Sequence, residues 1–245
     1  MPAHLTRRKL MVRLAGWLFG LTAGSFPFTG KSYAEKVLHI YSTEVPMKLP
    51  QPQINAGATL GRAIKNRRSI RSFSPESLKL EQLSQLLWSA QGITEDSGFK
   101  RAAPSAGALY PMDLYAVVGA ERIEGLKEGI YHYVPGSHTL AVVVAGDFNR
   151  ELARAALSQT WMAQAPLTLV ITAEYRRITV KYRDRGIRYA MIEAGHIGQN
   201  IFLMAEALGL GAGIVGAFND EEVKRLMQIP RTHEPLLIMP VGMKH

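Results

Sequence analysis

The sequence contains no cysteine, so disulfide bonds, thiolate metal sites and cysteine nucleophiles are excluded. It also has no internal repeat, no low-complexity segment and no apolar run long and continuous enough to indicate a membrane span with certainty. No P-loop or dinucleotide fingerprint is present, because the glycines of Gly209–Gly213 follow a helical pattern instead of opening one. What remains is a chain of 245 residues with 47% hydrophobic content, enough for one large or two small domains with a buried core.

Acidic residues are missing from the first 34 positions, although bases are frequent there. The chain has 29 lysines and arginines against 20 acids, a formal net charge of +9. Five of those bases lie in residues 1–34, so the remainder carries 24 bases and a charge of only +4. We therefore expect no nucleic-acid partner, despite the high isoelectric point.

Residues 1–34 have the pattern of an export signal. The pair Arg7-Arg8 precedes a modestly apolar run at 14–28, and Ser32-Tyr33-Ala34 is a candidate cleavage motif. Paired arginines are typical of the bacterial twin-arginine route, and a general secretory signal or an uncleaved anchor are the alternatives. We predict a periplasmic or otherwise exported protein that begins at Glu35 and keeps no stable membrane span after cleavage.

The rest of the chain divides into an extended arm at 35–57 and a single domain at 58–245. The arm is rich in proline and shows no clear period. Within the domain, periodicity and capping residues predict both helices and strands, and hence an α+β fold. The helices are expected at 59–66, 81–91, 150–158 and 220–227, and the strands at 113–118, 130–134, 139–144, 167–173 and 236–241.

A longer helix, from about Arg183 to Gly209, is expected at the centre of the domain. Apolar residues recur there at three- and four-residue steps, which indicates one buried face; they are Ile187, Met191, Ala194, Ile197, Ile201, Met204 and Leu208. Gly209 suits a left-handed C-cap. The glycine-rich segment that follows, Gly211–Gly216, either packs tightly between helix and strand or lets a flat ligand approach the backbone.

Three arginines, Arg67, Arg68 and Arg71, surround Ser69 at a helix exit. Guanidinium groups match phosphate oxygens and carbonyl edges, so the cluster suits an anionic ligand, with a solvated basic turn as the alternative. Glu193 and His196 have the i, i+3 spacing of some helical metal ligands, but the motif has no second copy. We therefore expect no metal, and a histidine hydrogen-bonded at an interface.

Four motifs in series carry a family resemblance. In order they are RRSIRSF, PSAGALYP, EAGHIGQN and ALGLGAGIVGAF, and together they resemble the FMN-dependent nitroreductase-like superfamily. PSAGALYP followed by Lys181-Tyr182 and RYAMIEAGHIGQN is similar to its SagB-type (thiazole-oxidase, ThcOx) dehydrogenase branch. The resemblance covers roughly residues 58–243. It implies an α+β fold with a mixed sheet flanked by helices, and FMN held at a homodimer interface.

The same resemblance assigns cofactor-binding roles by position. The phosphate, ribityl chain and pyrimidine edge would contact Arg67, Arg68, Ser69 and Arg71, with Lys244 as a further phosphate ligand. The turn at Pro104, Ser105, Ala106 and Gly107 would lie against the flavin of the partner subunit. The segment Val215, Gly216 and Ala217 would pass behind the ring, with the amide of Gly216 or Ala217 near N5.

The resemblance makes Lys181 and Tyr182 the catalytic pair. In azoline-oxidising relatives such a pair is associated with removing the substrate proton while the flavin takes hydride. A lysine is a useful base near neutral pH only if its pKa is depressed, and the neighbouring Arg183 and Arg185 favour that. The alternative is a surface turn in a charged loop.

The implied function is an FMN-dependent oxidoreductase that transfers hydride between an organic substrate, either a small molecule or a peptide, and flavin N5. Two alternatives stay open: an NAD(P)H-dependent nitro or quinone reductase, and a flavin-binding module without turnover. Many nitroreductases carry a long C-terminal arm that embraces the partner, whereas this sequence stops three residues after Gly242. The arm at 35–57 is expected to take that role, or else the dimer is less entwined.

Overall fold

The computed structural model describes residues 45–55 and 57–245. The predicted export signal at 1–34 and the first part of the arm lie outside these residues. Within the described part of the chain, no helix is both long and apolar enough to cross a membrane.

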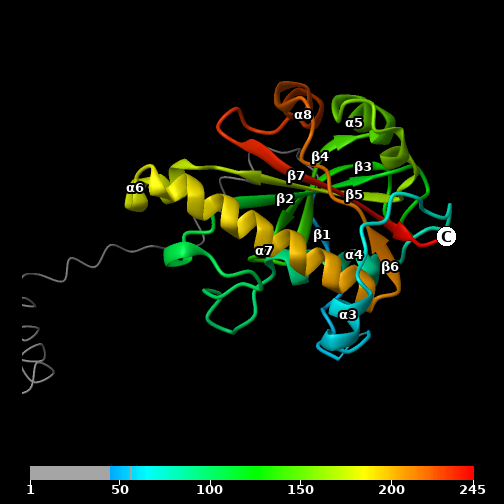
Figure 1. The fold of residues 1–245 in the computed structure, drawn as a ribbon, viewed down its shortest axis with the longest axis horizontal. Helices are drawn as coiled ribbons and strands as arrows, with labels where there is room; N and C mark the ends of the chain where they lie inside the picture. Colours follow the sequence, from blue (N-terminus) through cyan, green and yellow to red (C-terminus); the bar gives the residue numbers. More distant parts are fainter. Residues whose placement is uncertain (1–44, 56) are drawn as a thin grey trace, which may run out of the picture. The chain divides into compact units, whose positions relative to one another are not determined.

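Seven strands form one sheet in the order β1-β4-β3-β2-β5-β7-β6 (Figure 1). Every ladder between these strands is antiparallel, and an isolated parallel bridge joins Ser69 to Ala212, so the sheet is mixed. This bridge places the arginine motif beside the edge strand β6. The strands are β1 Met47–Lys48, β2 Met112–Val118, β3 Gly129–Val134, β4 Thr139–Ala145, β5 Leu167–Ala173, β6 Leu210–Ala212 and β7 Glu234–Met243.

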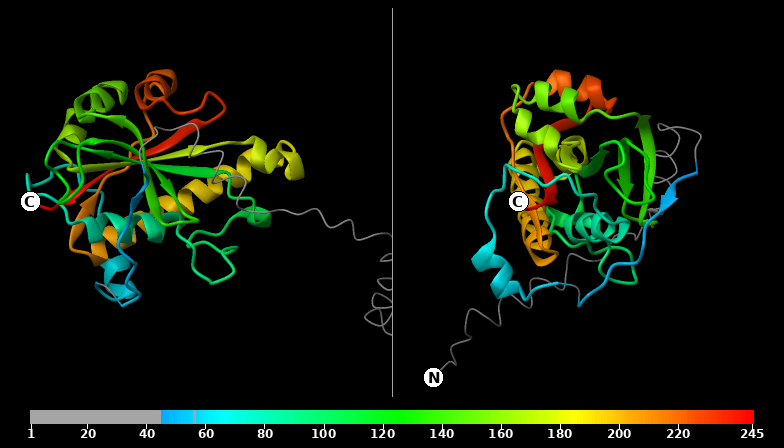
Figure 2. Two further views of the ribbon diagram at one scale, coloured as in Figure 1. Left: turned by 180° about the vertical axis from the view of Figure 1, so that it is seen from behind. Right: turned by 90° about the vertical axis from the view of Figure 1, so that its right-hand side faces the viewer.

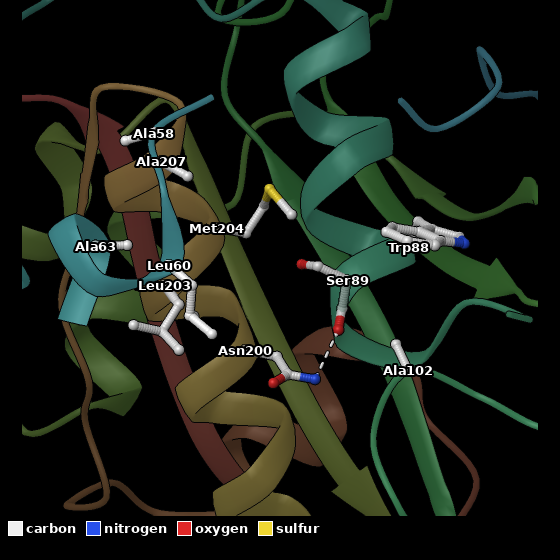
Figure 3. Close-up of a pocket in the computed structure, with 10 residues that line it drawn as sticks. All are labelled: Ala58, Leu60, Ala63, Trp88, Ser89, Ala102, Asn200, Leu203, Met204 and Ala207. Carbon is white, nitrogen blue, oxygen red and sulfur yellow. Dashed lines mark hydrogen bonds between the residues drawn. The ribbon is translucent and has the colours of Figure 1, made fainter. Parts of the chain in front are cut away.

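Helices cover both faces of this sheet, with α4 and α7 on one face and α5 and α8 on the other (Figure 2). Helix α7 packs beside α4, where the side-chain amide of Asn200 donates a 2.9 Å hydrogen bond to the carbonyl of Ser89 (Figure 3). The helices are α3 Leu60–Asn66, α4 Leu80–Gln91, α5 Asn149–Ala155, α6 Arg176–Tyr182, α7 Arg185–Ala207 and α8 Asp220–Met227.

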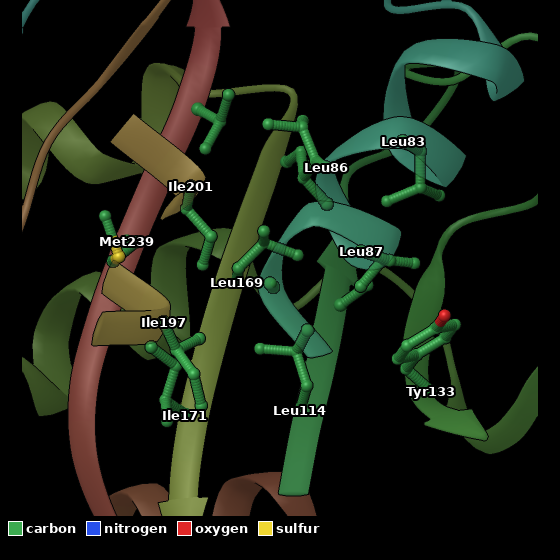
Figure 4. Close-up of a cluster of buried hydrophobic side chains, with 14 of the residues drawn as sticks. Leu83, Leu86, Leu87, Leu114, Tyr133, Leu169, Ile171, Ile197, Ile201 and Met239 are labelled. Carbon is green, nitrogen blue, oxygen red and sulfur yellow. The ribbon is translucent and has the colours of Figure 1, made fainter. Parts of the chain in front are cut away.

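Two hydrophobic cores result from this arrangement, because alternate residues of the central strands enter different layers. In β2, Leu114 packs towards α4 and α7, whereas Tyr115 packs towards α5 and α8. Leucines of α4, such as Leu86, meet Ile197 and Ile201 of α7 in the first core (Figure 4). The expected α+β architecture is therefore confirmed.

Most predicted elements are confirmed, and their capping explains where they end. The side chain of Asn219 accepts a hydrogen bond from the backbone N–H of Glu222 and so caps α8 as expected. Gly209 adopts the predicted positive φ, 77°. Helix α5 ends at Ala155 instead of residue 158, because Leu157 and Ser158 both take left-handed backbone angles that stop the helix.

The predicted buried face of α7 is correct at its centre and wrong at its start. Ala194, Ile197 and Ile201 are buried, but Ile187 and Met191 are 39% and 56% exposed. The buried residues at the start of the helix are Gly186, Ala190 and Glu193, of which Glu193 was not expected. Periodicity alone cannot distinguish a face that meets the core from a neighbouring apolar face that no other element of the described chain covers.

The described part of the arm lies against its own sheet. Strand β1 pairs with β4, and Leu49 is buried while its N–H donates to the carbonyl of His138. The hydroxyl of Ser84 on α4 donates to the carbonyl of Pro50. This part of the arm is consequently an edge strand of its own sheet, and its expected role in a dimer stays a prediction.

Candidate functional site

The arginine motif lies between two strands at one edge of the sheet. After α3, the N–H of Ile70 donates to the carbonyl of Ala212 at 2.8 Å, and the N–H of Ser74 donates to the carbonyl of Met243 at 3.1 Å. A bridge also pairs Phe73 with Lys244. The sheet thus fixes the backbone that carries the arginines and brings Lys244 beside it.

Arg68 and Arg71 are exposed and Arg67 is half-buried, and none of the three guanidinium groups forms an ion pair with a carboxylate of the described residues. Arg67 lies 5.2 Å from the ring centroid of Phe202 on α7, and Arg71 lies 5.9 Å from that of Trp161. Arg68 hydrogen-bonds only to backbone carbonyls of the α3 exit. Unpaired cations on a fixed backbone are a donor set that fits a phosphate.

Lys244 differs from these arginines, because its amine forms a 2.7 Å ion pair with Glu206 of α7. Both groups are partly buried. Lys244 is therefore close enough to the motif to contribute to an anion site, but it would have to share its charge with a carboxylate. Its role as a phosphate ligand stays a prediction.

The glycine-rich segment Gly211–Gly216 is tightly packed at its start and open at its end. A Cβ on Gly211 would lie 2.8 Å from the side chain of Ile70, and one on Gly213 would lie 2.7 Å from the ring of Trp161. Both glycines are thus needed for packing, as the alternative interpretation proposed. A Cβ on Gly216, by contrast, would meet nothing within 4 Å.

Beyond this packed region the backbone becomes accessible. Val215 is buried and exchanges two hydrogen bonds with Ile238, so its amide is occupied in the sheet. Gly216 and Ala217 are exposed, and neither backbone N–H has a hydrogen-bond partner among the described residues. Only this pair offers the free amide donors that the family resemblance places near a flavin. We call this region, with the arginine motif, the arginine end.

A second group of predicted site residues lies close together, away from the arginine end. The turn after Pro104 and Ser105 forms the short 3₁₀ segment η1, Ala106–Ala108, in which Gly107 takes φ 63°. A Cβ on Gly107 would lie 2.8 Å from the hydroxyl of Tyr182 and 3.0 Å from the amine of Lys181. Two motifs far apart in the sequence therefore touch, and we call this group the turn end.

Lys181 and Tyr182 lie in the last turn of α6, so the charged loop that was the alternative interpretation of this segment is wrong. Lys181 is exposed, and the half-buried ring of Tyr182 packs edge-on against Tyr189, 5.1 Å between centroids. The helix ends at Arg183, whose φ of 50° and ψ of −140° break the chain direction before α7 begins. Sequence reasoning missed α6 because a seven-residue helix has too few turns to show a period.

A buried ionic cluster beneath the turn end was also missed. Arg177 of α6 contacts Asp113 at 2.6 Å and Glu174 at 2.6 Å. His132 and His233 approach Asp113 at 3.1 and 3.4 Å. Burial alone would raise the pKa of Asp113, but the hydrogen bond to His132 and the charge of Arg177 hold it far below its ordinary value. These residues are scattered along the sequence, so no spacing indicated that they would meet.

Glu193 lies beside the same turn and is 1% exposed. Burial raises the pKa of its carboxyl to about 7, although the Ser105 hydroxyl and the Gln91 amide, which donates a 2.9 Å hydrogen bond, act in the other direction. His196, three residues later, is exposed. The two side chains therefore face different surroundings, and Glu193 belongs to the turn end.

The two ends are separated along α7. The arginine end contacts this helix at Phe202, and the turn end contacts it at Tyr189. With a rise of 1.5 Å per residue, these positions lie about 20 Å apart along the helix axis. One chain thus brings the predicted residues together as two groups and not as one site.

A groove of about 280 Å³ opens between α3, α4 and α7 (Figure 3). Its wall is mainly apolar, and it contains none of the predicted flavin-binding or catalytic residues. It is lined by Ala58, Leu60, Ala63, Trp88, Ser89, Ala102, Asn200, Leu203, Met204 and Ala207. The groove is therefore separate from the candidate chemistry.

The comparisons with known proteins agree on one family. The model of the nitroreductase family matches residues 64–243. The chain is 45% identical over 178 residues to a protein of Methanocaldococcus jannaschii named as a nitroreductase, MJ1384, and the match covers 73% of this chain and 87% of that protein. It is 29% identical over 171 residues to the microcin B17-processing protein McbC of Escherichia coli, covering 67% of this chain and 62% of McbC.

A solved structure supports the same assignment. The crystal structure of a protein from Ralstonia eutropha, described as a nitroreductase, matches with a TM-score of 0.71 and 29% identity. The match covers 82% of this chain and 90% of that one. Since the family model spans most of the sequence and the relative from M. jannaschii agrees with it, the chain belongs to the nitroreductase family of oxidoreductases.

Proposed function

We propose that this protein is an FMN-dependent dehydrogenase of the SagB type, which oxidises an organic substrate. The observation that carries the proposal is the contact of Lys181 and Tyr182 with Gly107, in a chain whose other end presents unpaired guanidinium groups. Bound FMN would supply the acceptor for two electrons as hydride. The protein would supply binding, orientation and a proton acceptor.

FMN would be held at the arginine end. Arg67, Arg68 and Arg71 have no competing carboxylate in the described chain, so the phosphate would be their principal anionic partner. The free amides of Gly216 and Ala217 are suited to hydrogen-bond acceptors on the ring edge. Ser69 adds a hydroxyl donor on the same backbone.

The turn end would complete the site from the second subunit of a homodimer. Ile187, Met191 and Ile192 form an exposed apolar strip on α7, and a Cβ on Gly195, near the middle of the helix, would meet no atom of the described residues within 4 Å. A two-fold axis passing near Gly195 would pair two α7 helices antiparallel. Such pairing places the arginine end of one chain beside the turn end of the other.

The proposed step divides two hydrogens of the substrate between two acceptors. One leaves as hydride to the cofactor, and the other leaves as a proton to the amine of Lys181, with Tyr182 orienting or relaying it. The product gains one double bond, as in the oxidation of an azoline to an azole. McbC is named as the microcin B17-processing protein, and together with the motif resemblance this similarity supports a peptide as the substrate.

A second candidate is an NAD(P)H-dependent nitro or quinone reductase. The 45% identity to the M. jannaschii protein named as a nitroreductase favours it. The two candidates differ in electron flow: rapid bleaching of the flavin by NADPH, with no bleaching by thiazoline or oxazoline peptides, would decide for the reductase.

Mixed dimers test the composite site. One tagged chain carries Arg71→Ala and the other carries Lys181→Ala, and the heterodimer is purified through both tags. It is assayed at an FMN concentration that fills the parental site but leaves the site of the Arg71→Ala homodimer largely empty. If each site combines the two subunits as proposed, one site of the heterodimer has both changes and the other has neither, so about half the parental activity returns. Activity that stays as low as in the two homodimers would mean that each chain forms its own site.

We also propose export through residues 1–34, based on the Arg7-Arg8 pair and the lack of acids. Changing both arginines to lysine should leave unprocessed precursor in the cytoplasm, detected by fractionation and N-terminal sequencing. Mature protein still beginning at Glu35 in the Lys-Lys variant would point to the general secretory route instead.

A further inference from the structure

Helix α6 carries the proposed catalytic pair, and its hydrophobic contacts with the core are made by two residues, Ile178 and the half-buried Tyr182. Ile178 is its only buried residue, and Val180 is 81% exposed. A helix of seven residues is not stable by itself in water, because nucleation is costly and few hydrogen bonds repay it. Contacts outside the helix must therefore determine its position.

Arg177 makes those contacts to three different segments. Its guanidinium lies 2.6 Å from Asp113 in β2 and 2.6 Å from Glu174 in the segment before α6. It also donates a longer, 3.4 Å hydrogen bond to the carbonyl of Tyr110, in the segment that follows the Ser105–Gly107 turn. A single side chain thus links the helix of the catalytic pair to the strand and turn opposite it.

The partners of Arg177 are fixed in turn. The side chain of Asp113 is 8% exposed and that of Arg177 is 15% exposed, so water screens their attraction weakly. His132 and His233 pack on Asp113 from β3 and from the residue before β7. A planar guanidinium held by two carboxylates has a defined direction, which a flexible surface pair lacks.

The backbone that follows Lys181 and Tyr182 also has to be held in place by its surroundings. Arg183 takes φ 50° and ψ −140°, a region that residues with a side chain rarely adopt. An added Cβ at Gly107 would lie 2.8 Å from the Tyr182 hydroxyl and 3.0 Å from the Lys181 amine, so the pair already contacts this turn. A small rotation of α6 would consequently separate the pair from the turn or press it into the turn.

We infer that Arg177 is a positioning residue, which holds α6 so that Lys181 and Tyr182 face the Ser105–Gly107 turn. The inference rests on the proposed function for its effect on rate, but the position of α6 is measurable without a substrate. Arg176 is the matched control, because it precedes Arg177 on the same helix and is exposed.

The absence of cysteine makes the position of α6 measurable by spin labelling. Val180→Cys, labelled with a nitroxide in the FMN-reconstituted protein, reports the mobility of the helix. Adding Arg177→Ala should shorten the correlation time of the label about twofold or more, as expected for a segment released into nanosecond motion. Adding Arg176→Ala should leave the spectrum as in the parent.

Kinetics then separate positioning from folding. Arg177→Ala should keep FMN bound and slow flavin reduction by a thiazoline peptide about 10–100-fold, since small misplacements of reacting groups have effects of that size. When Lys181 is already replaced by Ala, adding Arg177→Ala should lower the rate little further, because Arg177 acts through Lys181 and Tyr182. Arg177→Lys should recover only part of the rate, as an amine cannot replace the two-carboxylate geometry.

Two results would overturn the inference: a label equally immobile without Arg177, or a released label with an unchanged rate. If Arg177→Ala does not fold, Asp113→Asn removes the buried charge partner while keeping its shape, and the same two readouts apply to it. Failure of the proposed function would look different. In that case Lys181→Ala would leave the rate unchanged, while the label on α6 would still respond to Arg177.

Discussion

The arginine end and the turn end of α7 differ in whether their arginines are paired with carboxylates. At the arginine end, three guanidinium groups are free of carboxylates in the described chain, and two of them, on Arg68 and Arg71, are exposed. At the turn end, Arg177 is enclosed by Asp113 and Glu174. The first arrangement leaves positive charge that an anionic ligand can neutralise, whereas in the second the cation is already paired within the protein. One end is therefore suited to binding an anion, and the other to holding reactive side chains in place.

The largest effect is expected at the turn end. Lys181→Ala should retain FMN and its spectrum, yet slow substrate-dependent flavin reduction by roughly 10²–10⁴-fold, the range typical of losing a general base. Reduction by dithionite should be unchanged, because it needs no proton transfer from substrate. The measurement is stopped-flow absorbance with thiazoline and oxazoline peptides. Loss of FMN from this variant would show that the two ends do not act separately.

Glu193 should make stability depend on pH at the turn end. Its pKa in the folded protein is raised from 4.5 to about 7, so the stability from its protonated form is complete below pH 4.5 and is lost as pH rises through 7. The shift corresponds to about 3 kcal/mol at full ionisation. The difference in unfolding free energy between Glu193→Gln and the parent should therefore favour the variant more at pH 8 than at pH 5.

Urea denaturation at the two pH values measures this difference. Glu124→Gln, a change at an exposed carboxyl, is the control. If the difference between Glu193→Gln and the parent is the same at pH 5 and pH 8, the buried carboxyl does not titrate in this window.

Removing a cation at the arginine end should affect binding and not chemistry. Arg71→Ala should weaken FMN binding about 10–100-fold, because a hydrogen bond to a charged group contributes about 1.5–3 kcal/mol. Fluorescence titration of apoprotein with FMN measures the change. Arg150→Ala, an exposed cation on α5, should bind FMN like the parent. Equal weakening in both variants would indicate a general charge effect.

The smallest effects come from two glycines that distinguish the ends. Gly107→Ala should destabilise the apoprotein by about 1 kcal/mol, because φ is positive and the new Cβ would press on Lys181 and Tyr182. Gly216→Ala should leave apoprotein stability nearly unchanged, since its Cβ enters open space. It should nevertheless reduce FMN affinity if the ring packs there. Thermal melts with and without FMN separate the two cases, and the opposite ranking would contradict the assignment.

Local sequence determined the elements and the family. Periodicity predicted α4, α7 and the central strands, and capping residues such as Asn219 and Gly209 fixed the ends of helices. These features depend on neighbours along the chain, so they are visible without a structure. The order of four motifs was likewise enough to identify the nitroreductase family, which the match over residues 64–243 confirms.

Tertiary structure alone decided which residues meet. The contact of Gly107 with Lys181 and Tyr182, and the cluster of Asp113 with Arg177, join positions that no spacing relates. It also decided that Glu193 is buried while Met191 is exposed, although the apolar pattern favoured the reverse. The physical reason is that burial and charge pairing depend on the layers packed around a residue. Those layers come from distant parts of the chain, and local periodicity carries no information about them.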